Sequence, residues 1–340
     1  MKAISELRSE LMGLAIMWIM LYHMGFKLPL FLAPVTAVKM LGLTGVDIFF
    51  LLSGLGISFS WHADPNTARF LQKRLVRIAP VFWTLVLFSL IRDSMLTSLA
   101  LQDMTRFIGL DFLLLGQLDR WFVPAILLCY GLFVIVQKAR TCSSLKQVLL
   151  LCLAGVLMLD LLLPDSELDH LLILTVRLPV FLLGILIGQH LIEGRAAMLW
   201  QSWKLNGALL LGGLALWATV ALVVPNPVAW RYGLWWYPTA LMAYPVCLFA
   251  AQWLTTMRTE GALRTCLRVF GQYSLELYLV HEFIYSLAPH LGINSVAINV
   301  WRLPEYLIYF LLSAVLAVWM GPRFARLKLS SKAESALTRS

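Results

Sequence analysis

Apolar segments of about 20 residues recur along the whole chain, and shorter polar stretches separate them. A helix of about 20 apolar residues is long enough to cross the hydrocarbon core of a bilayer. The pattern therefore predicts an all-α polytopic membrane protein with about ten transmembrane helices, at 9–27, 41–61, 78–96, 121–138, 146–163, 170–192, 206–224, 234–254, 266–288 and 302–321.

The composition supports a membrane protein rather than a soluble one. Hydrophobic residues make up 60% of the 340 positions and charged residues only 13%, whereas soluble domains carry about 25% charged residues. No stretch is typical of a separate soluble domain. We therefore expect one transmembrane domain over residues 1–328 and a short cytoplasmic tail over residues 329–340.

The distribution of basic residues predicts the orientation of the helices. With the N-terminus inside, the predicted inner segments hold 19 of the 27 Lys and Arg residues and the outer segments hold 8. Membrane proteins collect Lys and Arg in cytoplasmic loops, so the bias predicts that both termini are cytoplasmic. The same rule explains the net charge of +9, and we expect no nucleic-acid partner.

Two ionisable side chains are predicted to lie in the outer third of the membrane. His23 follows Arg8 by 15 residues, which is about 22 Å along a helix axis, and Asp47 lies near the outer end of the second, inward-running helix. The two could meet, and a carboxylate would orient the imidazole as general-base chemistry requires. The alternative is an interfacial histidine and an aspartate favoured by the dipole at a helix N-terminus.

A basic cluster precedes the third predicted helix: Arg69, Lys73, Arg74 and Arg77. Arg74 and Arg77 are three residues apart, so they share one face of a helix. Two guanidinium groups on one face suit a phosphate-rich ligand. The alternative is an anchor that contacts lipid headgroups.

Other polar and small residues have open interpretations. The small residues of Ser53-Gly54-Leu55-Gly56 indicate close helix packing rather than a phosphate loop. Trp121 is typical of an interfacial aromatic belt. Glu276, His281 and Glu282 in the ninth predicted helix either line a polar cavity or join helices through hydrogen bonds. No spacing of residues suggests a metal site, and we expect none.

Several segments, in order, resemble the membrane-bound acyltransferase-3 family, whose members O-acylate bacterial surface glycans. The resemblance covers nearly the whole chain, and Gly45–Gly54 with Phe70–Pro80 carry its most specific part. The segments are Leu11-Met12-Gly13-Leu14-Ala15 with Leu21-Tyr22-His23, Gly45-Val46-Asp47-Ile48-Phe49-Phe50-Leu51-Leu52-Ser53-Gly54, Phe70 to Pro80 with Arg74 and Arg77, Trp121-Phe122-Val123-Pro124, and Gly271 to His281.

The resemblance implies roles for these residues. It implies an acyl-CoA donor, most often acetyl-CoA, as a substrate with no permanently bound cofactor. We expect Arg74 and Arg77, with Arg8, to hold the donor's phosphates. Many members carry an arginine where this chain has Met12, and Arg8 lies one helical turn earlier on the same face.

The family resemblance also predicts the reaction. His23 is expected to act as general base on an acceptor hydroxyl or to carry the acyl group briefly, and Asp47 to orient it. Trp121, Glu276 and His281 are candidates for substrate binding. The acceptor is expected to be a surface glycan or a lipid-linked sugar, and the location the bacterial cytoplasmic (inner) membrane among its lipids.

Two other classes of function stay open from the sequence. A transporter or flippase would use the intramembrane His, Asp and Glu as a proton relay, and it would respond to a proton gradient and ignore CoA. A non-catalytic receptor or scaffold would tolerate the loss of His23.

Overall fold

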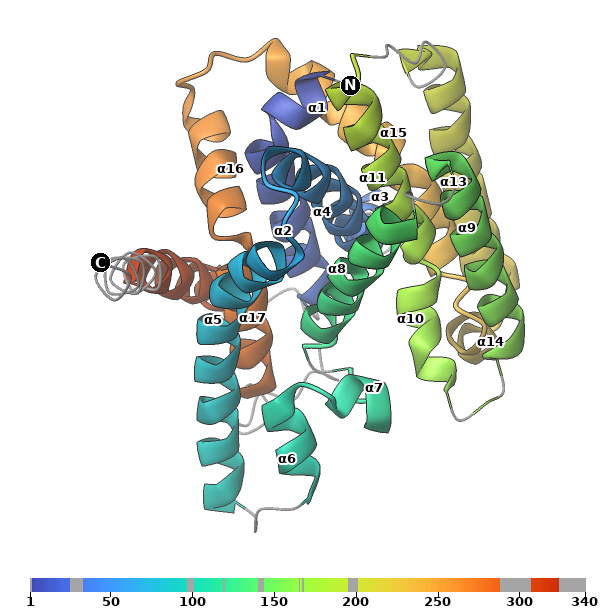
Figure 1. Ribbon diagram of the computed structural model, residues 1–340. Coiled ribbons are helices and arrows are strands. Elements are labelled where there is room, and N and C mark those ends of the chain that lie inside the picture. Colours follow the sequence, from blue (N-terminus) through green and yellow to red (C-terminus); the bar gives the residue numbers. More distant parts are fainter. Residues whose placement is uncertain are drawn as a thin grey trace, which may run out of the picture. The chain divides into compact units, whose positions relative to one another are not determined.

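The computed structural model describes residues 2–24, 33–96, 101–118, 120–139, 144–164, 166, 168–194, 201–287 and 307–323. Within these ranges the regular structure is helical and no strand occurs, so the all-α prediction is confirmed (Figure 1). The predicted tail at 329–340 lies outside the described residues.

The chain forms two compact units, and helices α2, α3, α5 and α8 each continue from one into the other. The first unit comprises Met1–Tyr22, Lys39–Thr67 and Ala125–Gln272. It contains all or most of α1 (Lys2–Glu6), α2 (Arg8–His23), η2 (Leu41–Leu43), α4 (Thr44–Ala63), α8 (Phe122–Ala139), α9 (Leu145–Leu162), η3 (Asp169–Leu171), α10 (Leu172–Thr175), α11 (Leu178–Ile192), α13 (Trp203–Val223), α14 (Asn226–Arg231), α15 (Trp236–Thr255) and α16 (Ala262–Gln272).

The second unit comprises His23–Val38, Ala68–Pro124 and Tyr273–Ser340. It contains most of α3 (Ala33–Met40) and α5 (Thr67–Leu96), together with α6 (Leu101–Ile108), α7 (Asp111–Leu115), α17 (Ser274–Leu287) and the helix Leu307–Arg323. His23, the last residue of α2, belongs to this second unit.

Several predicted helices differ in extent from those observed, and the third, sixth and ninth are among them. The basic cluster joins the third predicted helix, so that α5 is 30 residues long. The sixth predicted helix is divided, because Pro179 lacks an N–H group and begins a new helix in the first turn of α11. The ninth is divided at Tyr273 into α16 and α17.

The first half of the ninth predicted helix is polar for a physical reason. Arg264 and Arg268 of α16 form ion pairs with the buried Glu10 of α2, with Nε–Oε1 distances of 3.3 and 3.2 Å. Charged side chains are costly in hydrocarbon. The charges of α16 are therefore paired within the first unit, and this helix ends at Gln272, before the break.

Among the described residues, five helical segments are both long and apolar enough to cross a membrane, by length and composition. Shorter apolar helices lie at Gln147–Leu162 and Leu307–Arg323. The prediction of ten spans with both termini inside stays a prediction. The five segments are Ala33–Ala63, Thr67–Asp93, Phe122–Ala139, Asp169–Ile192 and Trp203–Val223.

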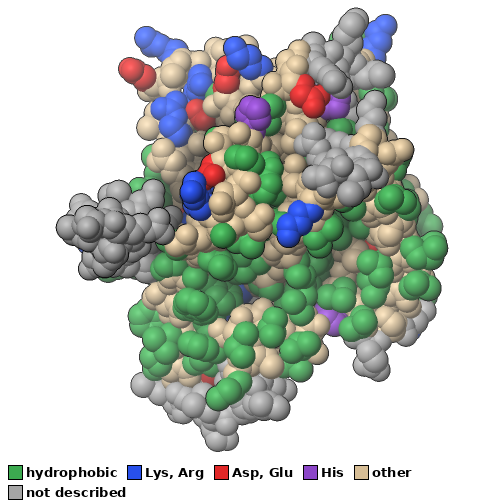
Figure 2. Space-filling view, in the orientation of Figure 1, with side chains coloured by type: hydrophobic (Ala, Val, Ile, Leu, Met, Phe, Trp, Pro, Cys, Tyr) green, Lys and Arg blue, Asp and Glu red, His purple; other side chains and the backbone are tan. Residues whose placement is uncertain are grey.

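Large apolar side chains are exposed on several of these helices. Leu151 and Leu161 of α9 are 72% and 79% exposed, and Leu222 of α13 is 86% exposed. Green hydrophobic side chains accordingly cover much of the face drawn in Figure 2. A soluble monomer rarely leaves such surface in water, so this surface, with the apolar helices, indicates a multi-pass membrane protein.

Glycines let α4 and α11 approach closely within the first unit. A methyl group at Gly54 would collide with the Phe181 carbonyl, and one at Gly184 would collide with the Leu51 carbonyl. Ser58 adds a polar contact, because its hydroxyl donates to the Ile185 carbonyl at 3.3 Å. Small residues allow this kind of packing between membrane helices, which confirms the interpretation of the Ser53–Gly56 segment.

A buried ion pair lies beside this crossing. Nε of Arg177, at the start of α11, is 3.4 Å from Oδ1 of Asp47 in α4, and both side chains are completely buried. The Arg177 guanidinium also donates to the Ile173 carbonyl at 2.6 Å and lies 5.4 Å from the Trp236 ring of α15. The ion pair and the contact with Trp236 therefore connect α4, the start of α11 and α15.

We expect Asp47→Ala to lower the free energy of unfolding by about 3–5 kcal/mol, because the buried Arg177 charge loses its carboxylate. The double variant Asp47→Ala/Arg177→Met should recover much of this loss, since it removes both charges. Thermal unfolding of the purified protein in detergent measures the effect. A double variant as unstable as the sum of the two single variants would contradict a pairwise role.

Candidate functional site

Two histidines that are 258 positions apart in the sequence meet in the second unit. His23 Nδ1 lies 3.1 Å from His281 Nε2, and the two ring centroids are 5.1 Å apart. His23 is exposed at the end of α2, whereas His281 of α17 is completely buried. The structure thus brings together two of the side chains selected from the sequence.

The backbone of α17 determines which nitrogen of His281 carries a hydrogen. His281 Nδ1 lies 2.9 Å from the Leu277 carbonyl one turn earlier. A carbonyl only accepts hydrogen bonds, so Nδ1 of His281 donates, and in the neutral ring Nε2 is then an acceptor.

This arrangement also determines the tautomer of His23. Because His281 Nε2 accepts, His23 Nδ1 must carry the hydrogen that lies between the two rings. In a neutral His23 the lone pair is then on Nε2. The chain of hydrogen bonds from Leu277 through His281 therefore leaves a basic nitrogen on the exposed histidine.

Glu282 brings a negative charge to the same place. Its carboxylate and the ring nitrogens of His23 and His281 offer atoms that all lie within 4.8 Å of one another. Glu282 Oε2 accepts a hydrogen bond from the backbone N–H of Arg120 at 2.9 Å. The carboxylate is therefore held beside the histidine pair by a backbone donor.

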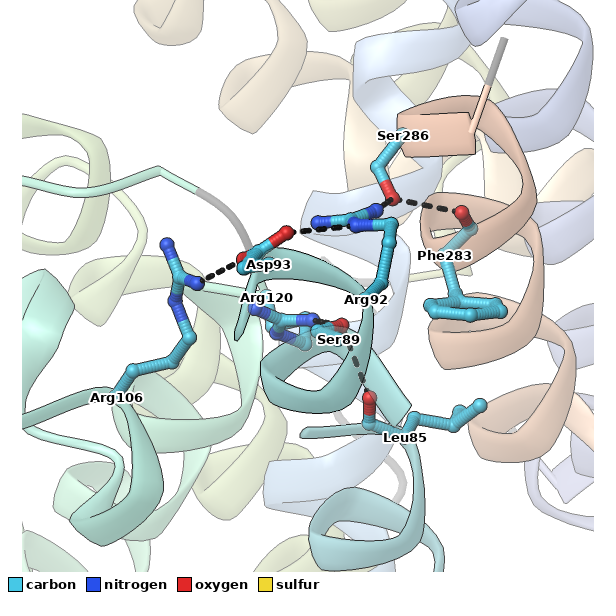
Figure 3. Close-up of polar contacts among 8 residues, drawn as sticks. All are labelled: Leu85, Ser89, Arg92, Asp93, Arg106, Arg120, Phe283 and Ser286. Carbon is cyan, nitrogen blue, oxygen red and sulfur yellow. Dashed lines mark hydrogen bonds and ion pairs between the residues drawn. The ribbon is translucent and has the colours of Figure 1, made fainter. Parts of the chain in front are cut away.

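Arg120 connects this carboxylate to α5. Its backbone is left-handed (φ 58°), which is uncommon for a residue with a side chain. Its buried guanidinium donates to the Ser89 hydroxyl at 2.8 Å, and that hydroxyl donates to the Leu85 carbonyl at 3.0 Å (Figure 3). Arg120 thus presents its N–H to α17 and its side chain to α5.

A second set of contacts joins the far end of α5 to α6 and α17 (Figure 3). Arg92 donates to Asp93 and to the Ser286 hydroxyl, each at 2.7 Å. Arg106 of α6 donates to the other oxygen of Asp93, also at 2.7 Å. One of these hydrogen bonds, from Arg92 to Ser286, therefore joins α5 directly to the half of α17 that carries His281 and Glu282.

Aromatic rings surround the buried histidine. The Tyr278 and Tyr285 rings lie 5.6 and 5.9 Å from that of His281. The centroid of the Tyr278 ring lies 5.3 Å from that of Phe122. The Phe122 centroid in turn lies 6.3 Å from that of Trp121. Trp121 is only 8% exposed, so it packs as part of this group of aromatic rings beside the histidines. Its contact with a substrate stays a prediction.

The two arginines of the basic cluster lie on α5, in the same unit as the histidine pair. Arg74 is half-buried, with its guanidinium 5.1 Å from the Phe70 ring, and Arg77 is exposed. Both have interactions within the protein. Their predicted role in holding phosphates stays a prediction.

The register of α5 against α17 gives the separation of these groups. Phe88 contacts Phe283, with centroids 6.4 Å apart, and Arg92 contacts Ser286, so the two helices run in the same direction. His281 is then level with about residue 86 of α5. Arg77 and Arg74 lie about 14 and 18 Å earlier along the α5 axis, at 1.5 Å per residue.

The other predicted residues have separate surroundings. Arg8 donates to the Leu52 carbonyl at 3.0 Å, and its guanidinium lies over Gly56, where a side chain would collide with it. Arg8 and Asp47 belong to the first unit and His23 to the second, so the pairing of Asp47 with His23 stays a prediction. Glu276 is buried in α17, five residues before His281.

Three contributors to these sites were not selected from the sequence as site residues: Glu282, Arg120 and Arg177. Glu282 directly follows His281 and is one of the three polar residues of the ninth predicted helix, so the sequence offers a local indication of it. Arg120 and Arg177 are among the 8 Lys and Arg residues of the predicted outer segments, where the sequence indicates no further role. Their partners are distant in sequence, so no local spacing indicates them.

The comparisons with known proteins identify the family. A family model described as an acyltransferase domain matches residues 11–321. No curated protein and no solved structure matches the chain. The matched range includes every site residue named above except Arg8, and it covers most of the sequence, so the chain belongs to the acyltransferase-3 family.

Proposed function

We propose that this acyltransferase moves an acyl group, most simply acetyl, from cytoplasmic acyl-CoA to a hydroxyl of a surface or lipid-linked glycan, with His23 as the general base. The observation that supports this most directly is the hydrogen-bond chain from Leu277 through His281 to His23. It places the ring hydrogen on Nδ1 of His23 and so makes Nε2 the basic nitrogen that a hydroxyl would use.

The proposed reaction is one acyl transfer. His23 Nε2 takes the proton of the acceptor hydroxyl while that oxygen attacks the thioester carbonyl. The carbon–sulfur bond then breaks, the acyl group stays on the acceptor oxygen, and the imidazolium returns its proton to the CoA thiolate. His23 ends in the tautomer in which it began, because it takes up and releases the proton at Nε2. His281 therefore neither gains nor loses a proton during the reaction.

In this scheme His281 and Glu282 are positioning residues with different tasks. His281 accepts from Nδ1 and so keeps the His23 lone pair on Nε2, which is the task of a carboxylate in other catalytic sites. Glu282 places a negative charge within 4.8 Å of the ring nitrogens. That charge stabilises the imidazolium formed when His23 takes a proton.

The donor and acceptor would approach from different directions. Arg74 and Arg77, with Arg8, would hold the donor's phosphates, because guanidinium groups pair well with phosphate oxygens. The 14–18 Å along α5 between the two arginines and the level of His281 would be spanned by the extended arm of CoA. The acceptor sugar would lie against the exposed side of His23, in the bacterial inner membrane.

The first test is an acyl-transfer assay with His23→Ala. Purified protein in detergent is given acetyl-CoA and a lipid-linked glycan acceptor, and release of free CoA thiol is followed. We expect kcat to fall by about 10²–10⁴-fold, the usual contribution of a general base. The matched control is His190→Ala, whose Nδ1 also contacts the carbonyl one turn earlier, at 2.8 Å; wild-type kcat in His23→Ala would overturn the proposal.

A pair of variants at His281 tests the tautomer argument. His281→Leu removes the acceptor for His23 Nδ1, and we expect kcat to fall by about 10²-fold with little change in KM for acyl-CoA, as for a misoriented catalytic group. His281→Gln keeps an oxygen acceptor near the position of Nε2 and should recover most of the rate. Equal losses in both variants would indicate packing rather than hydrogen bonding.

Binding of acyl-CoA tests the donor site. Arg74→Ala/Arg77→Ala should weaken acetyl-CoA binding by about 10-fold or more, because each charge-assisted hydrogen bond contributes about 1.5–3 kcal/mol. The control is Arg69→Ala/Lys73→Ala, which removes the same charge from two exposed positions of the same helix. Calorimetry measures both, and equal weakening by both pairs would favour a general anchor to lipid headgroups.

A further inference from the structure

We propose that His23, His281 and Glu282 also form a binding site for a zinc-class divalent ion, and that the bound ion inhibits acyl transfer by occupying His23 Nδ1. The two imidazoles come from α2 and α17, and the carboxylate follows His281 directly. No spacing along the sequence indicates this site, because the two histidines meet only in the folded chain. The inhibitory part of this inference rests on the proposed function, whereas the binding part does not.

The distances among the ligand atoms suit a small transition-metal ion. Ligands at about 2.0–2.1 Å from a tetrahedral zinc ion are about 3.3 Å from one another. His23 Nδ1 and His281 Nε2 are 3.1 Å apart, and a carboxylate oxygen of Glu282 lies within 4.8 Å of one nitrogen of each ring. Small rotations of the exposed His23 ring and of the Glu282 side chain would complete the geometry.

The surroundings of the ligands also suit a metal. Nδ1 of His281 donates to the Leu277 carbonyl at 2.9 Å, and metal-ligating histidines typically donate their other ring N–H to such a group. Glu282 has two carboxylate oxygens, so one can bind the ion while the other accepts from Arg120 N–H. Two histidines and a glutamate form a known zinc ligand set that leaves the fourth position open.

The choice of ligands predicts which ions bind. Imidazole nitrogens suit zinc, copper, nickel and cobalt, whereas Mg²⁺ and Ca²⁺ prefer oxygen ligands. The site should therefore bind Zn²⁺ or Co²⁺ and not respond to Mg²⁺ at similar concentrations.

The tautomer of His23 links metal binding to activity. In the hydrogen-bonded state Nδ1 carries the ring proton and Nε2 has the lone pair. An ion on Nδ1 requires the lone pair there, so the proton of the neutral ring moves to Nε2. No proton is released from His23, but the nitrogen that faces the acceptor is no longer a base.

Direct binding tests the site without any assay of activity. The purified full-length protein carries an affinity tag without histidine, and its Zn²⁺ binding is measured by equilibrium dialysis with elemental analysis. The absorption of bound Co²⁺ reports tetrahedral coordination. We expect one equivalent in the wild type and at least about 100-fold weaker binding in His281→Ala, since loss of even an outer partner of a metal ligand costs about 10–100-fold.

The control variants separate this site from other histidines. Glu282→Gln should also weaken Zn²⁺ binding, whereas His190→Ala, which removes a histidine of the first unit, should leave it unchanged. Zn²⁺ binding that is the same in the wild type, His281→Ala and Glu282→Gln overturns the proposal.

The inhibitory part is tested with the acyl-transfer assay. Zn²⁺ should lower the wild-type rate at the concentration at which it binds, a chelator should restore it, and Mg²⁺ should have no effect. Binding that depends on His281 without inhibition would overturn the inhibitory role. If no variant and no condition gives acyl transfer, the proposed function fails, and the dialysis experiment still decides whether the metal site exists.

Discussion

The cost of burying a polar side chain without a partner governs both units of this protein. Inside a membrane helix bundle a charged or polar group is stable only when another group satisfies it. Arg177 and Asp47 satisfy this constraint as an ion pair between two helices. His281 satisfies it through the Leu277 carbonyl on one side and His23 on the other, and this second solution gives the site its chemistry.

The histidine pair illustrates how a structural constraint becomes a functional one. A buried imidazole that donates to its own helix has only one nitrogen left, and that nitrogen must accept. The exposed partner is then held in a single tautomer. His23 Nδ1 and His281 Nε2 can share either a hydrogen bond or, as proposed, a metal ion. The hydrogen bond keeps Nε2 of His23 basic, whereas the metal ion puts a proton on Nε2 and removes its basicity. Glu282 supports both states, because a carboxylate stabilises an imidazolium as well as a divalent cation.

Much of the architecture was predictable, since it depends on local patterns. Apolar segments identified the helical regions, and the small residues near Gly54 identified a close helix crossing. The boundaries were less predictable where polar contacts intervene. The basic cluster continues into α5 without a break, whereas the ninth helix is divided at Tyr273, and its first part, α16, pairs Arg264 and Arg268 with Glu10. Such ion pairs depend on a helix that is distant in sequence.

The sequence by itself determined the class of protein, the family and the identity of His23, His281, Arg74 and Arg77 as candidates, because hydrophobicity and motif order are local properties. Only the tertiary structure decided the partners. It placed His281 at Nδ1 of His23, and it placed Arg177 beside Asp47. The physical reason is that a hydrogen bond or ion pair acts over a few ångströms, and only folding brings residues more than a hundred positions apart within that range.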